Sequence, residues 1–176
     1  MLGGSRGEAA WIEEALARYE RPLLRYALRF VRDEETARDV VQDVFFKLCR
    51  AERAKVEERL ASWLYTVCRN RALDVLKKER RMGRLEDAGK IVDQGAGGPR
   101  VKAELAETQR LVLSALDELS SRQREAFLLK FQDDLSYREI GRVLDVSLGN
   151  VSKLIATALA AVRDRLREDG AEEGKG

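Results

Sequence analysis

The chain has no histidine, only two cysteines and two prolines, and aromatic residues make up 6% of its 176 positions. Without histidine it lacks the commonest metal ligand and the usual general base of a nucleophilic triad. No apolar run reaches the roughly 18 residues of a membrane-spanning helix, and no charged segment followed by an apolar one opens the sequence. We therefore expect a soluble, cytoplasmic protein that does not insert into a membrane, is not an enzyme and needs no metal or cofactor.

What the chain has in quantity is hydrophobic residues, at 44%, and charged residues, at 36%. The scarcity of proline and phenylalanine beside abundant Leu, Ala, Arg and Glu predicts an all-α protein. Cys49 and Cys68 each stand alone in an apolar periodic stretch. That placement predicts two small buried side chains and no disulfide.

The sequence pattern of residues 1–82 predicts one helical domain. Apolar residues at three- and four-residue spacing predict a helix from Trp11 to Val31, which Pro22 either kinks or divides. Asp33 is a plausible N-cap for the next helix. Its inward face is predicted to be Ala37, Val40, Val41, Val44, Phe45, Leu48 and Cys49, and its outward face to include Asp39, Gln42, Asp43 and Phe46. An outward phenylalanine suggests a docking surface, although a wide apolar arc would also explain it.

A polar connection over 51–58 leads to a third helix, for which we predict an inward face that includes Trp63, Leu64 and Cys68. Its other side carries a polar stripe. Between Arg69 and Arg84 there are seven basic residues and two acidic ones. Such a run is often only a solvated helix end, but its density fits a nucleic-acid footprint better. The stripe consists of Asn70, Asp74, Lys77 and Arg81.

Residues 83–104 hold five glycines, one proline and no periodicity, which predicts a flexible linker. A second helical domain is expected over 105–176. Ser120 with Gln123 and Ser136 with Glu139 have capping-box spacing, so each pair marks a helix start. A tight turn over 145–147 then separates two helices, which is the pattern of a helix-turn-helix.

The helix after that turn carries little charge for a DNA-reading element. Between Asp145 and Val162 the only basic residue is Lys153. Residues 104–176 have a net charge of −3, whereas residues 1–82 have +4. We therefore predict weak DNA binding by the C-terminal half, or a surface that docks a protein instead. The polar side chains available to base edges are Asn150, Ser152, Lys153 and Thr157, with Arg138 and Arg142 as phosphate anchors on the preceding helix.

Four segments occur in an order and separation that chance rarely supplies: DVVQDVFFKL, ASWLYTVCRNRALDVLKKERR, ALDELSSRQREAFLL and LSYREIGRVLDVSLGNV. They resemble bacterial sigma factors of the sigma-70 family, and the size and two-domain plan are similar to its extracytoplasmic-function (ECF) group. The chain departs from the family pattern at Ser120, where proline is usual, and in the thin charge after Gly149.

The resemblance implies three interfaces. Asp39, Gln42, Asp43 and Phe46 would dock on the clamp helices of core RNA polymerase. The helix-turn-helix would read the −35 promoter element through Arg138, Arg142, Asn150, Ser152, Lys153 and Thr157. A connection around Arg53 to Glu57 would hold a flipped base of the −10 element. The full set expected at the −10 element is Arg53, Lys55, Arg69, Asn70, Arg71, Asp74, Lys77, Lys78 and Arg81.

The expected partners are therefore core RNA polymerase, promoter DNA and, from the resemblance alone, an anti-sigma factor. The leading interpretation is a transcription initiation factor that directs polymerase to promoters and assists melting. One alternative is a sigma-like polymerase-binding protein that selects promoters poorly, acting as a competitor or needing an activator. A less favoured alternative is a stand-alone helix-turn-helix regulator, which leaves Phe46 and the basic helix unexplained.

Overall fold

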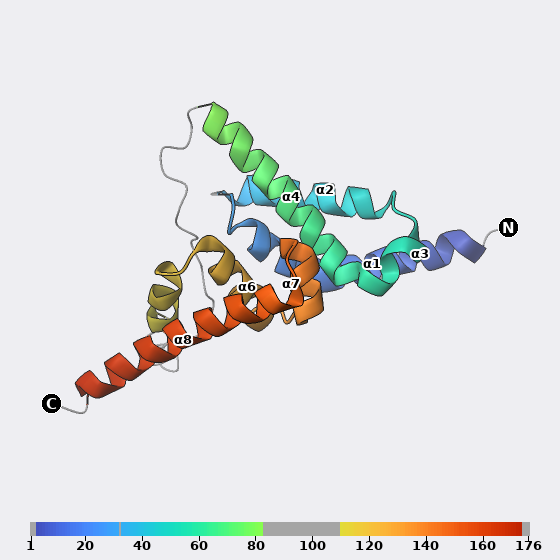
Figure 1. The fold of residues 1–176 in the computed structure, drawn as a ribbon. Helices are drawn as coiled ribbons and strands as arrows, with labels where there is room; N and C mark the ends of the chain where they lie inside the picture. The colour runs from blue at the N-terminus through green and yellow to red at the C-terminus, as the bar shows by residue number, and fades with distance from the viewer. Residues whose placement is uncertain (1–2, 32, 83–109, 174–176) are drawn as a thin grey trace. The chain divides into compact units, whose positions relative to one another are not determined.

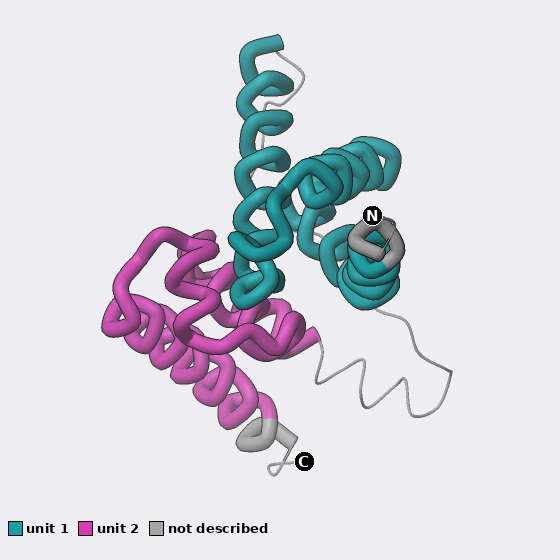
Figure 2. Tube along the Cα trace, turned by 90° about the vertical axis from the view of Figure 1, so that its right-hand side faces the viewer, with its two compact units in different colours: residues 1–93 teal, residues 94–176 magenta. Residues whose placement is uncertain are grey.

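The computed structural model describes residues 3–31, 33–82 and 110–173, with the side chains of 7–31, 33–82 and 110–169. Every regular element in these ranges is helical. The chain divides into two compact units, residues 1–93 and 94–176 (Figure 2). The prediction of an all-α protein with two helical domains is confirmed. The predicted linker over 83–104 lies outside the described residues, so the domain limits that it sets remain predictions.

The first helix, α1 (Gly3–Ala27), begins earlier than the periodicity predicted and runs through Pro22. The alternative of a new helix starting at Pro22 is therefore wrong. Its buried face includes Trp11, Leu23 and Tyr26. Leu16, which belongs to the apolar pattern, is nevertheless 40% exposed.

Helix α2 (Glu34–Leu48) begins where the sequence predicted, because Asp33 Oδ1 accepts a hydrogen bond from the Thr36 N–H at 2.7 Å. The predicted inward residues from Ala37 to Leu48 are all buried. Cys49 is exposed, so its predicted burial is wrong. It follows the buried Leu48 by one residue, which turns its side chain about 100° away from the middle of the stripe.

The connection after α2 is more ordered than a polar loop. It forms one short helix, α3 (Arg53–Val56), and a single 3-10 turn, η1 (Glu57–Arg59). Helix α4 (Leu60–Arg81) follows and packs against both α1 and α2, which also pack against each other. The last turns of α4 extend past these two helices (Figures 1 and 2).

The buried face of α4 differs from the predicted one. Leu64, Cys68 and Ala72 are buried, which confirms the prediction for Cys68, but the aromatic residue in the core is Tyr65. Its ring lies 5.0 Å from that of Tyr26 on α1. Trp63 is only half-buried, so the prediction that it belongs to the core is wrong. It precedes Cys68 by five residues and therefore lies on a different side of the helix.

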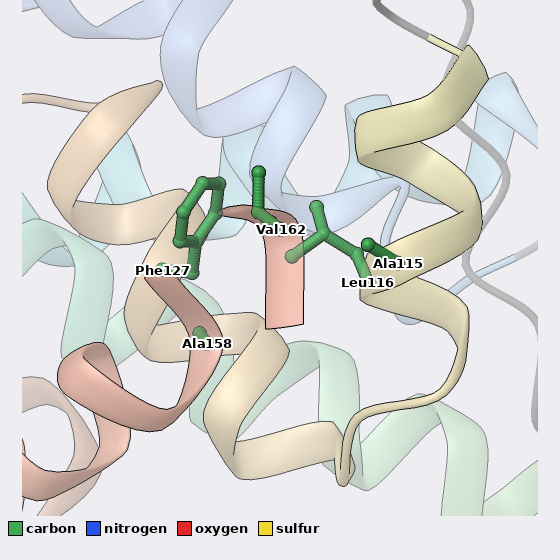
Figure 3. Packing of buried hydrophobic residues seen from close by; sticks show 5 residues of the cluster. All are labelled: Ala115, Leu116, Phe127, Ala158 and Val162. Atoms are coloured by element: carbon green, nitrogen blue, oxygen red, sulfur yellow. The ribbon is translucent and has the colours of Figure 1, made fainter. Parts of the chain in front are cut away.

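The second unit contains a helix over 110–117, then α6 (Ser121–Phe131), α7 (Tyr137–Leu144) and α8 (Leu148–Glu173). Its core brings together side chains from three of these helices. In Figure 3, Leu116, Phe127 and Val162 point toward one another. The cluster consists of Ala115, Leu116, Phe127, Ala158 and Val162.

Both predicted capping boxes are present. Ser120 caps α6 with Gln123, and Ser136 caps α7 with Glu139. Asp145 ends α7 in the left-handed region at φ 53° and leads into α8. The predicted helix-turn-helix is thus α7, the turn over 145–147 and α8. The buried side chains that close its angle are Ile140, Val143, Leu144, Val151, Ile155 and Ala158.

Over the described ranges, no single helix is long and apolar enough to cross a membrane. Helices α7 and α8 meet that test of length and composition only when joined, and they are bent by 101° at the turn between them.

Candidate functional site

The outward face of α2 presents an isolated aromatic side chain among polar ones. Phe46 is 56% exposed, and Asp39 and Gln42 beside it are exposed as well. The stripe on the opposite side of α2 is fully buried. Phe46 therefore lies outside the core of the first unit, and its apolar ring is available to a partner.

Asp43, the fourth residue of this face, is paired with a residue that the sequence assigned to another interface. Its Oδ2 lies 2.6 Å from Nε of Arg71 on α4, and both side chains remain more than 40% exposed. The two residues are 28 positions apart, so no local pattern could have indicated the pair. The pair joins the predicted polymerase-docking face to the predicted −10 face.

The remaining −10 candidates on α4 lie on its accessible side. Arg69 is half-buried, and it has an interaction partner. The others begin at Asn70 and continue into the last turns, which extend past α1 and α2 (Figure 1). A long accessible helix that is rich in cations can follow a single strand of nucleic acid. These exposed residues are Asn70, Arg71, Asp74, Lys77, Lys78 and Arg81.

The connection of α3 and η1 holds the two other −10 candidates in different settings. Lys55 is exposed and forms an ion pair with Glu52 at 2.8 Å. The Arg53 side chain is 41% exposed, and its guanidinium lies 5.3 Å from the centre of the Trp11 ring. Arg53 also donates to Glu57, and this hydrogen bond lowers the pKa of the Glu57 carboxyl below its ordinary value. Sequence reasoning missed Trp11, whereas the four-residue spacing of Arg53 and Glu57 was a readable signal.

In the second unit, the helix-turn-helix borders an open depression of about 410 Å³. Arg138 and Arg142 of α7 line it, together with Ser147 and Leu148 at the start of α8. Ser147 Oγ accepts a hydrogen bond from the Asn150 N–H at 3.3 Å, which supports the first turn of α8. Two arginines beside a helix N-terminus make a suitable surface for a phosphate.

The outward face of α8 mixes polar and apolar side chains. Asn150, Ser152, Lys153 and Thr157 are all exposed, as predicted. Leu159, at 43% exposure, lies among them and can contact only an apolar group. This face can offer hydrogen bonds to base edges, but from the start of α8 to Val162 it provides a single cation, Lys153, for the phosphates.

Within the part of the chain that the structure describes, no group of three or more metal-ligating side chains comes together. The geometry there consists of surfaces: an aromatic docking face, a cationic helix and a helix-turn-helix.

Comparison with known proteins explains this combination. Residues 15–82 match the family described as sigma-70 region 2, and residues 109–162 match sigma-70, region 4. The ferric citrate uptake sigma factor FecI of Escherichia coli (strain K12) is 32% identical over 124 residues, which cover 70% of this chain and 72% of FecI. The ECF RNA polymerase sigma factor SigM of Bacillus subtilis (strain 168) is 23% identical over 158 residues, 89% of this chain and 93% of SigM.

A solved structure has the same fold. It is the sigma factor RpoE in complex with the anti-sigma factor NepR from Bartonella quintana, and its chain is 20% identical with a TM-score of 0.59. The match covers 88% of this chain and 96% of that one. The two matched regions lie in the two units of the fold, one in each. A stand-alone helix-turn-helix regulator would lack region 2, so the match to region 2 argues against that alternative. The chain therefore belongs to the sigma-70 family, as an ECF sigma factor that binds RNA polymerase and directs it to promoters rather than catalysing a reaction.

Proposed function

We propose that this sigma factor docks on the clamp helices of core RNA polymerase through the outward face of α2, formed by Asp39, Gln42, Asp43 and Phe46. The exposed ring of Phe46 is the observation that carries the proposal, because a large apolar side chain that lies outside the core is presented on a polar face. Aromatic residues at the centre of an interface commonly contribute about 2 kcal/mol or more to binding.

The test is the affinity of Phe46→Ala for core polymerase, measured by fluorescence anisotropy of the labelled full chain. We expect a loss of at least tenfold. The matched control is Leu16→Ala, which removes another exposed apolar side chain, on α1, and should bind as the wild type does. Equal affinity of the two variants would rule out Phe46 as a docking residue.

We propose that the accessible side of α4 contacts the −10 element and that the α3–η1 connection, residues 53–59, receives one unstacked base. The support is the concentration of cations on the last turns of α4, where a freed strand needs phosphate contacts. The proposed α4 contacts are Arg69, Asn70, Arg71, Asp74, Lys77, Lys78 and Arg81, and Lys55 belongs to the connection.

Asn70→Ala tests this assignment, because the residue is exposed on α4 and its removal leaves the core intact. Permanganate reactivity of promoter thymines measures opening, and anisotropy measures polymerase binding. Opening should fall several-fold while polymerase binding stays unchanged. The reverse pattern would place Asn70 at the polymerase interface instead.

We propose that α8 reads the −35 element weakly, through Asn150, Ser152, Lys153 and Thr157, with Arg138 and Arg142 on phosphates. The presence of a single cation, Lys153, between the start of α8 and Val162 supports a shallow salt dependence and low affinity. Run-off transcription from a randomised promoter library tests it. Enrichment of an upstream and a downstream motif would support −35 reading, and enrichment of the downstream motif alone would assign selection to α4. Absence of transcripts despite tight polymerase binding would favour a competitor, or a factor that needs an activator.

We further propose that the chain works in the cytoplasm, where transcription takes place, with domain limits at 1–82 and 105–176. An anti-sigma factor is proposed as a third partner. Its support is that the RpoE relative was solved in complex with an anti-sigma factor.

A further inference from the structure

We propose that Arg53 is a positioning residue that acts through Trp11. In this proposal the two side chains orient the α3–η1 connection and so set its base preference, without Arg53 contacting DNA. The inference rests on the proposed function, in which that connection receives one unstacked base of the −10 element.

The contacts of Arg53 all lie within the protein. Its guanidinium lies over the Trp11 ring, Nη1 donates to the Gly7 carbonyl at 3.4 Å, and Nη2 donates to Glu57 Oε1 at 2.5 Å. Its Nε is buried, whereas the side chain as a whole is 41% exposed, so its orientation depends on these three contacts rather than on burial. A planar guanidinium held by a ring and two acceptors would lose these contacts if it turned toward a phosphate.

The connection needs such an anchor because it has little core of its own. Helix α3 is four residues long and η1 three, which is too short for either to be stable alone. Of residues 53–59, only Val56 is buried. The contact of Arg53 with Trp11 adds a second attachment, which fixes the connection to α1.

Trp11 is suited to be the fixed end of this attachment. It is only 8% exposed, and it belongs to α1, which packs against both α2 and α4. Arg53 belongs to α3, and Glu57 is the first residue of η1. The hydrogen bond between them therefore links both parts of the connection to the Trp11 ring.

While Arg53 is held by its contacts within the protein, Lys55 and Glu58 are exposed side chains of the connection that can contact a base, since the ion pair of Lys55 with Glu52 is itself exposed to solvent. A lysine donates to guanine or thymine oxygens, whereas a glutamate accepts from the amino group of cytosine or adenine. Their discrimination depends on where the backbone of α3 and η1 holds them, and that is what Arg53 sets.

The experiment uses the full chain with core polymerase on promoters that differ only in the base at one −10 position. All four bases are compared at each position in turn, and the readout is the ratio of transcripts from the best base to those from the next. Arg53→Lys keeps the charge, Trp11→Leu removes the aromatic face, and Trp11→Phe is the matched control that keeps it. We expect Arg53→Lys and Trp11→Leu each to lower the ratio about tenfold at the same position. The double variant should be no worse than either, and Trp11→Phe should retain most of the preference.

Four outcomes would overturn the inference. Loss of preference in Arg53→Lys with full preference in Trp11→Leu would mean that Arg53 contacts DNA directly. A lower unfolding temperature with an unchanged ratio in both variants would mean a structural role only. If Lys55→Ala with Glu58→Ala alters the preference but Arg53→Lys and Trp11→Leu do not, the connection reads a base without this anchor. If the variant with both Lys55→Ala and Glu58→Ala changes the preference at no −10 position, the proposed role of the connection is wrong, and the inference fails with it.

Discussion

Gly141 on α7 provides a sharp test of how the helix-turn-helix is built. A Cβ added there would lie 2.9 Å from the carbonyl oxygen of Val146, closer than side-chain carbons approach backbone oxygen. That carbonyl belongs to the turn between α7 and α8, which contains Asp145 at φ 53°. The turn is also held by a hydrogen bond from the Val146 N–H to the Gly141 carbonyl at 3.0 Å. The carbonyl therefore has little freedom to withdraw.

The expected cost of Gly141→Ala follows from two opposing effects. Overpacking a buried position typically costs about 1–3 kcal/mol, and a rigid backbone neighbour places this case in the upper part of that range. Alanine is the better helix former and offsets about 1 kcal/mol. We therefore expect the second unit to lose about 1–2 kcal/mol of unfolding free energy, which lowers amide protection in α7 and α8 roughly five- to thirtyfold.

Gly149→Ala is the matched control. It makes the same chemical change eight residues later on the same motif, but a Cβ there meets nothing within 4 Å. It should be neutral, or should raise stability by up to about 1 kcal/mol.

Hydrogen exchange of the full chain separates the two variants, and denaturation followed by tryptophan fluorescence serves as an internal control. Both tryptophans, Trp11 and Trp63, belong to the first unit, so their unfolding curve should not move. Equal protection in Gly141→Ala and Gly149→Ala would refute the steric reasoning, as would a shift of the tryptophan curve with α7 and α8 unaffected.

Three further predictions concern the first unit. Asp33→Ala should cost about 1 kcal/mol at neutral pH. Hydrogen bonds from Thr36 lower the pKa of Asp33, so the stabilisation is present above the pKa of the unfolded state and is lost as the pH falls through the pKa of the folded state. The unfolding free energies of the wild type and the variant should therefore converge on acid titration. A constant difference would contradict the cap. A double-mutant cycle of Asp43→Ala and Arg71→Ala should give a coupling of about 0.2–1 kcal/mol that shrinks with salt, since both side chains are exposed; a coupling of about 2 kcal/mol or more would contradict this. A thiol reagent should label Cys49 in the native protein and Cys68 only after unfolding, and labelling of both at one rate would contradict their different burial.

Several features of this protein follow from its sequence alone because they depend on neighbours along the chain. The cap at Asp33 and the two capping boxes are formed by side chains and backbone groups three residues apart, so residue type and spacing suffice to predict them. The buried stripe of α2 is regular enough that its direction was predictable, and the order of the motifs was enough to indicate the sigma-70 family.

Other features were decided only in the tertiary structure. Periodicity placed Trp63 and Cys49 in the core, but the helices actually packed against α4 and α2 leave Trp63 half-buried and Cys49 exposed, and Tyr65 fills the space beside Tyr26. The apolar stripe of a helix is wide enough for a neighbouring helix to pack against it from several directions. The stripe alone does not determine which of these directions the neighbour takes. The pairs Asp43–Arg71 and Arg53–Trp11 join residues 28 and 42 positions apart. They exist because the fold brings distant helices into contact, and no spacing along the chain could have predicted them.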